Sequence, residues 1–89
     1  MKFEWDENKN VENIAKHGLS FDEAKFAFCD KQRLIERDIN HSTKTESRYF
    51  LYGDNGKGIV TIRFTVREDR IRIYGAGYWR EGKRKYEQR

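Results

Sequence analysis

At 89 residues the chain has room for one small domain with a thin hydrophobic core, which excludes two separately folded domains. Its formal net charge of +4 is unevenly spread, because the segment from Arg63 to the end carries nine Lys/Arg against four Asp/Glu. The single cysteine excludes an intrachain disulfide, and neither a signal peptide nor an apolar run of membrane-spanning length is present. We therefore expect a cytoplasmic protein, outside any membrane, whose basic half binds nucleic acid or an acidic protein.

Two helices are predicted in the first third of the chain. The first begins at Asp6, a good N-cap, and ends at residues 16–18, where cations precede a glycine that can turn left-handed. Its apolar positions follow at helical spacing: Val11, Ile14 and Ala15. The second helix begins at Ser20, which forms a capping box with Glu23, and continues to about Cys29.

The rest of the chain alternates with a period of two, which predicts strands. A short strand candidate precedes the helices, and longer ones follow them: residues 1–5, 33–38, 46–52, 59–67 and 70–78. Residues 54–58 predict a hairpin turn, and residues 80–89 predict a basic helix. We therefore expect an α+β fold in a single domain, residues 1–89. Two N-terminal helices would pack on one face of an antiparallel sheet of about four strands, leaving the other face open, and a short C-terminal helix would follow.

The predicted strand at residues 59–67 has one apolar and one largely cationic face. Arg63 and Arg67 lie on the cationic face, and the next strand adds Arg72 and Tyr74 to it. The apolar face consists of Val60, Ile62, Phe64 and Val66. Converging guanidinium groups suit a phosphate backbone, because arginine presents a rigid fork that matches phosphate oxygens. A solvated outer face of an antiparallel sheet explains the same alternation, so both interpretations stay open.

Several stretches, taken together, form a pattern that extends through nearly the whole chain. They are Phe3–Asp6, Lys9, Asn13, Lys16–Ala24, Asp38, His41-Ser42, Glu46, Arg48, Gly53, Gly58, Val60, Arg67, Arg72-Ile73 and Arg84–Glu87. This order resembles the BrnT family, the toxins of a bacterial type II toxin–antitoxin system. The block Lys16–Ala24 is the most specific part of the resemblance.

The resemblance implies a RelE-like fold and cleavage of RNA. It also implies a BrnA-like antitoxin that binds the toxin and the operator, so that operator DNA is reached only through the complex. The chain departs from the pattern after Arg72-Ile73, where many members carry Ser-Ala-Arg and this chain has Gly77 in place of the arginine. Arg80 or Arg72 would then have to supply that charge.

RNA cleavage without metal or cofactor needs a base for the 2′-hydroxyl proton, cations around the phosphoryl group and an acid for the leaving 5′-oxygen. We assign charge stabilisation to Arg67 and Arg63, with Arg72 and Arg80 as further phosphate-binding candidates. His41 is the leading acid–base candidate, because it lies in a polar loop and imidazoles exchange protons near neutral pH.

The remaining candidates each have a plainer alternative. Tyr86 is a second acid–base candidate that could simply pack on the sheet, and His41 could hydrogen-bond locally with Ser42. Tyr74 could stack on unpaired bases or pack against the antitoxin. Lys16 could bind phosphate or remain a solvated helix lysine.

The leading hypothesis is an endoribonuclease toxin that its antitoxin inhibits by covering the cationic face. It predicts that Arg67→Ala abolishes toxicity in a folded protein. The alternatives are a non-catalytic module that binds the antitoxin and helps the complex hold DNA, and a plain RNA-binding domain.

Overall fold

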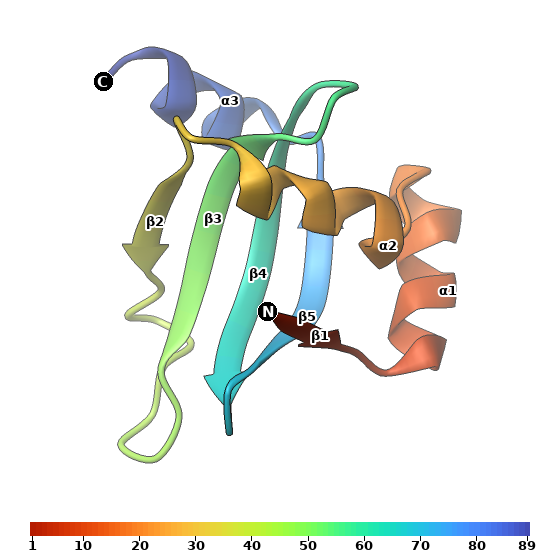
Figure 1. The fold of residues 1–89 in the computed structure, drawn as a ribbon, viewed down its shortest axis with the longest axis vertical. Helices are drawn as coiled ribbons and strands as arrows, with labels where there is room; N and C mark the ends of the chain where they lie inside the picture. Colours follow the sequence, from red (N-terminus) through yellow and green to blue (C-terminus); the bar gives the residue numbers. More distant parts are fainter.

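A five-stranded mixed sheet forms the centre of the computed structural model, which describes residues 1–89 (Figure 1). Its strands are β1 (Lys2–Glu4), β2 (Leu34–Arg37), β3 (Arg48–Asp54), β4 (Ile59–Arg67) and β5 (Arg70–Gly77). Strands β2 to β5 form an antiparallel meander, and β1 pairs in parallel with β5. The two edge strands of the sheet are therefore β2 and β1. The α+β class is confirmed, but the prediction of about four antiparallel strands is wrong. The local pattern at residues 1–5 cannot reveal a partner nearly 70 positions away.

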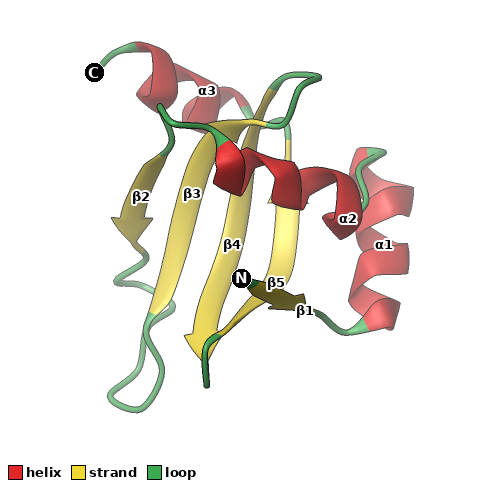
Figure 2. Cartoon of the chain, viewed as in Figure 1, coloured by secondary structure: helices red, strands yellow, loops and turns green.

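The helices are α1 (Glu7–His17), α2 (Phe21–Ala24), the 3₁₀ helix η1 (Lys25–Cys29) and α3 (Arg80–Glu87) (Figure 2). The prediction of two N-terminal helices is wrong, because only α1 is a helix of several turns there. Although the capping box at Ser20 is present, α2 is a single turn that continues as η1. Phe21, Ala24 and Ala27 are completely buried, and this spacing of three residues matches the 3₁₀ repeat. None of these helices has the length and apolar character that a membrane span requires.

Helix α1 contacts the sheet through Asn13, and its apolar stripe faces outward. Val11 and Ile14 are exposed, whereas Asn13 is buried and donates from Nδ2 to the carbonyl oxygens of Leu19 (2.8 Å) and Ala76 (2.9 Å). The Ala76 amide donates in turn to Asn13 Oδ1 at 3.2 Å. Strand β1 pairs only with the first residues of β5, so the later part of that edge needs polar partners. The predicted apolar interface of α1 is therefore wrong.

The hydrophobic core lies between α2, η1 and one face of the sheet. Val60, Ile62 and Phe64 of β4 point into it, as predicted, while Val66 is 54% exposed at the end of the strand. A bulge changes the register between β4 and β5, since Arg63 pairs with Gly75 and Phe64 pairs with Ile73. Tyr74 is thus the extra residue of β5, and Ile73 and Ala76 on either side of it both reach the core.

Helix α3 packs on the opposite face of the sheet, where it lies behind β3 and β4 in the view of Figure 2. Its Gly82 is buried against Thr61 and Tyr52, which point away from the core, and Lys85 pairs with Glu36 of β2 at 2.8 Å. The expectation that this face stays open is therefore wrong for the half that α3 covers. The half beyond α3 carries Arg48 and Arg63.

We expect Gly82→Ala to lower the free energy of unfolding by about 1–3 kcal/mol, the usual cost of overpacking. A Cβ at this position would lie 2.9 Å from Tyr52 Cδ1 and would also collide with the Thr61 hydroxyl, and both residues are buried. Helix propensity alone predicts the reverse, since alanine favours a helix by about 1 kcal/mol over glycine. Urea denaturation measures the sign, with the exposed Lys83→Ala as the control in the same helix. Unchanged or increased stability would contradict the docking of α3 through Gly82.

Candidate nucleic-acid cleavage site

A pocket of about 350 Å³ occupies the uncovered half of the second sheet face. Its lining is strongly cationic, with two lysines, two arginines and two histidines against one glutamate. The residues are Lys9, Glu12, Asn13, Lys16, His17, His41, Arg48, Arg63 and Tyr74. They come from α1, from the loop after β2 and from the three central strands, so the site exists only in the folded chain.

Two local geometries bring these side chains together. On α1 the pocket residues recur every three or four positions, which places them on one face of the helix. On the sheet, Arg48 lies opposite Thr65 and Arg63 lies opposite Gly75, so both arginines point to the face that Thr61 and Tyr52 share.

Arg63 lies close to two aromatic rings at the floor of the site. Its Cζ is 5.4 Å from the centroid of the Tyr74 ring and 6.0 Å from that of Trp79. Arg48 approaches the same Tyr74 ring at 4.3 Å. These are cation–π distances, which hold the guanidinium groups in place without consuming their N–H donors.

Two buried polar atoms at this floor have no hydrogen-bond partner, Arg63 Nε and the Tyr74 hydroxyl. Burial raises the pKa of Tyr74 above its ordinary value, although Arg48 and Arg63 act in the opposite direction. The hydroxyl therefore keeps its proton at neutral pH and remains a donor. Unpaired buried donors are costly, so an anion bound at this floor would relieve an energetic penalty.

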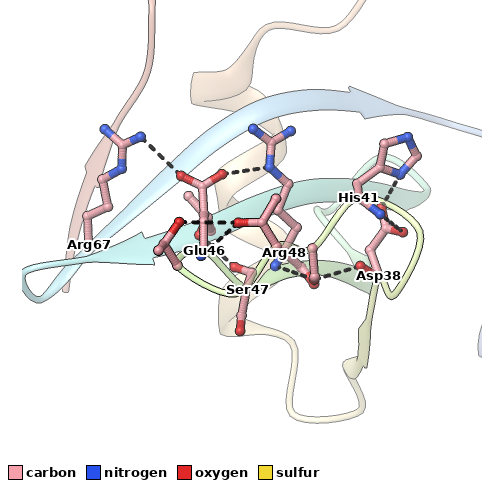
Figure 3. Close-up of polar contacts among 10 residues, drawn as sticks. Asp38, His41, Glu46, Ser47, Arg48 and Arg67 are labelled. Carbon is pink, nitrogen blue, oxygen red and sulfur yellow. Dashed lines mark hydrogen bonds and ion pairs between the residues drawn. The ribbon is translucent and has the colours of Figure 1, made fainter.

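Glu46 holds Arg48 and Arg67 from the rim of the pocket (Figure 3). Its Oε1 accepts from Arg48 Nε at 2.7 Å, and its Oε2 accepts from Arg67 Nη2 at 3.1 Å. The hydrogen bond from Arg48 and then that from Arg67 hold the pKa of Glu46 below its ordinary value. The carboxylate is thus ionised at neutral pH and fixes the direction of the Arg48 side chain.

Of the eight site residues predicted from the sequence, the fold brings four into this pocket: Arg63, His41, Tyr74 and Lys16. Arg67 lies beyond Glu46 at the rim, and Arg72 pairs with Glu4 of β1 at 3.2 Å. Arg80 is exposed at the start of α3, and Tyr86 faces Asp30 instead of the pocket. The roles of all eight residues stay predictions, but the geometry favours the first four.

Sequence reasoning did not select Arg48, His17, Lys9 or Glu12 as site residues. The signal for the three α1 residues was present, because residues 9, 12, 16 and 17 share a helix face opposite the apolar stripe. Arg48 could have been found by extending the alternation of β3 back from Tyr52 through Phe50. Which helix face meets which strand face, however, depends on packing that periodicity does not specify.

The departure at Gly77 has a structural counterpart in this chain. A Cβ at Gly77 would lie 2.7 Å from Trp79 Nε1, so the indole ring occupies the place of any side chain there. Trp79 also packs edge-on against His17, with ring centroids 5.3 Å apart. Neither Arg72 nor Arg80 reaches the pocket in place of an arginine at 77, whereas Arg63 and Arg48 lie in it.

We expect Tyr86→Phe to leave RNA cleavage unchanged and to alter acid stability. The Tyr86 hydroxyl donates to Asp30 Oδ2 at 2.6 Å, and this bond is the main reason why the pKa of Asp30 lies below its ordinary value. A depressed carboxyl pKa stabilises the fold above the unfolded-state pKa, and this contribution is lost as the pH falls through the folded-state pKa. The variant should therefore lose stability less steeply in acid, as thermal unfolding against pH would show. A large loss of cleavage would instead restore Tyr86 as an acid–base candidate.

No three His, Cys, Asp or Glu side chains are grouped closely enough to hold a metal ion. Residues 5–83 match the family model described as the ribonuclease toxin, BrnT, of type II toxin–antitoxin systems. A search of curated proteins gave no match.

Proposed function

Because the chain belongs to the BrnT family of ribonuclease toxins of type II toxin–antitoxin systems, we propose that the pocket between α1 and the sheet is where it cleaves RNA. The observation that carries this proposal is the convergence of four cations, two imidazoles and an unpaired tyrosine hydroxyl on one hollow. The family implies an antitoxin partner, and we propose a BrnA-like protein that covers this cationic face.

The proposed reaction is an endonucleolytic transesterification that requires no metal. The 2′-hydroxyl oxygen attacks the adjacent phosphorus, and a base takes its proton. The bond from phosphorus to the 5′-oxygen breaks, and an acid protonates that oxygen. The products are a 2′,3′-cyclic phosphate and a 5′-hydroxyl end.

Each part of this reaction has a group in the pocket. Arg48 and Arg63 bind the phosphoryl oxygens, where electrostatic stabilisation is usually the largest single contribution. The Tyr74 hydroxyl donates to the same oxygens. His41 is the proposed base, and His17 lines the same pocket and is able to protonate the leaving oxygen.

Further cations lie beside the proposed cleavage position, where the neighbouring nucleotides of a longer RNA would bind. Lys9 and Lys16 are seven positions apart on α1 and line one wall of the pocket. They would bind phosphates next to the scissile one, with Arg67 at the rim beyond Glu46. Such contacts release counterions, so binding should weaken as salt increases. Operator DNA, in this proposal, is bound only by the complex with the antitoxin.

Cleavage of a single-stranded RNA oligonucleotide in EDTA tests this function. We expect products that end in 2′,3′-cyclic phosphate, and no cleavage of the same oligonucleotide with a 2′-O-methyl group at the cleaved position. Activity that EDTA abolishes, or cleavage of the methylated strand, would contradict the mechanism. Binding without turnover would favour an RNA-binding domain. Neither binding nor turnover, in a chain that still binds its antitoxin, would favour the non-catalytic module.

A further inference from the structure

Asp38 is a buried carboxylate directly after β2, and the backbone around it is tied to the start of β3. The side chain is only 4% exposed. The Asp38 amide donates to the Arg48 carbonyl at 2.8 Å. Ser42 Oγ donates to the Asp38 carbonyl at 2.7 Å and accepts from the Arg48 amide at 2.9 Å. Backbone groups and Ser42 therefore hold the loop against the start of β3, and the Asp38 carboxylate takes no part in these three bonds.

Both hydrogen bonds of the Asp38 carboxylate go to one residue, His41 (Figure 3). Oδ1 accepts from the His41 amide at 3.3 Å, and Oδ2 lies 2.8 Å from His41 Nδ1. An ionised carboxylate only accepts hydrogen bonds, so in the neutral imidazole the proton must be on Nδ1. The other ring nitrogen, Nε2, then carries the lone pair that can accept a proton. The His41 side chain lines the cationic pocket and is half exposed.

We propose that Asp38 is a positioning residue that fixes the tautomer and direction of His41, so that Nε2 is the atom that takes the 2′-hydroxyl proton. This inference rests on the proposed function, because His41 is the base in that reaction. It extends the site by one residue that does not touch the substrate. A carboxylate behind an imidazole fixes the ring orientation and stabilises the imidazolium that forms when the proton is taken.

The variant Asp38→Asn separates this role from a structural one. In this variant the side-chain amide oxygen must face the backbone N–H of His41. In the opposite rotamer the side-chain NH₂ would face that N–H, and both groups are donors. The amide NH₂ would then face Nδ1 and force the proton onto Nε2. The substitution leaves the backbone hydrogen bonds of the loop and those of Ser42 unchanged, so the fold should persist. We expect cleavage to fall by about 10²- to 10⁴-fold, the range for general acid–base catalysis.

The first measurement concerns the free protein and needs no substrate. In ¹⁵N-labelled protein, at a pH well above the ordinary imidazole pKa of about 6.5, couplings between ring nitrogens and carbon-bound protons report the tautomer. The chain has two histidines, and His17→Gln assigns the signals. We expect the Nδ1–H tautomer for His41 in the parent chain and the Nε2–H tautomer in Asp38→Asn. An Nε2–H tautomer in the parent chain, or no change in the variant, would overturn the proposal.

The second measurement is a double-mutant cycle on cleavage rate. If Asp38 acts through His41, Asp38→Asn causes no further loss in a His41→Ala background. An equal loss in both backgrounds would assign Asp38 a structural role and overturn the proposal. Asp54→Asn, at the end of β3, is the matched control and should cleave normally. A parent chain with the expected tautomer but no cleavage would refute the proposed function and leave the positioning of His41 established.

Discussion

Replacing Arg63 by alanine is expected to lower RNA cleavage by about 10²- to 10³-fold, the cost of removing one donor that stabilises charge in the transition state. Arg63 lies within cation–π distance of two aromatic rings and has a buried Nε without a partner, so its guanidinium is held at the pocket floor before substrate arrives. Arg48→Ala should act similarly, because Glu46 and the Tyr74 ring fix its direction. Cleavage of a labelled RNA oligonucleotide by each purified variant would measure both effects.

Two further arginine variants remove the same charge elsewhere. Arg67→Ala, at the rim, should reduce cleavage far less than Arg63→Ala and mainly decrease the salt dependence of binding. Arg84→Ala, on α3 and paired with Glu81, should cleave normally. Equal losses at Arg67 and Arg63 would mean that both arginines stabilise the reacting phosphate, as the sequence alone predicted. A loss in all variants would indicate a dependence on net charge and not on the pocket.

The parts of the fold that sequence predicted well are those in which neighbouring residues decide the structure. The alternation in β4, the turn after Asp54, the cap at Asp6 and the glycine stop of α1 are all present where expected. Each depends on contacts within a few residues. The predicted face of β4 was also correct, because a strand with one apolar side has one stable orientation.

The parts that sequence could not predict are set by contacts between distant segments. Strand β1 pairs with β5, and Gly82 of α3 packs on Thr61 of β4, so both contacts join residues at least 21 positions apart in the chain. The packing of α3 determines which part of the polar sheet face remains available for the site. Helix α3 covers the Thr61 end of the polar face, so the cationic surface is smaller than predicted and lies beside α1. Asn13 belonged to the family pattern in the sequence, but its spacing did not predict that it would hold α1 to Ala76.

Gly75→Ala should abolish most cleavage without unfolding the protein. A Cβ at this position would lie 2.7 Å from Arg63 Nε and 2.8 Å from Nη2. The nearest atoms belong to the end of a flexible side chain, so Arg63 would move away and the backbone would stay. Alanine also costs less conformational entropy than glycine in a strand, by about 0.5–1 kcal/mol, so stability should be retained. We expect a loss close to that of Arg63→Ala, with an unfolding midpoint within a few degrees of the parent chain.

A combination of variants shows whether this loss acts through Arg63. In an Arg63→Ala background there is no guanidinium to displace, so adding Gly75→Ala should cause no further loss of cleavage. Gly58→Ala, whose Cβ would meet only the Tyr78 ring at 3.2 Å, provides a glycine-to-alanine control outside the pocket. Additive losses in the double variant would mean that Gly75 contributes independently, for example by letting a substrate approach the backbone of β5. Normal cleavage by Gly75→Ala would show that Arg63 keeps its function from a shifted position, and the proposed floor of the site would then be wrong.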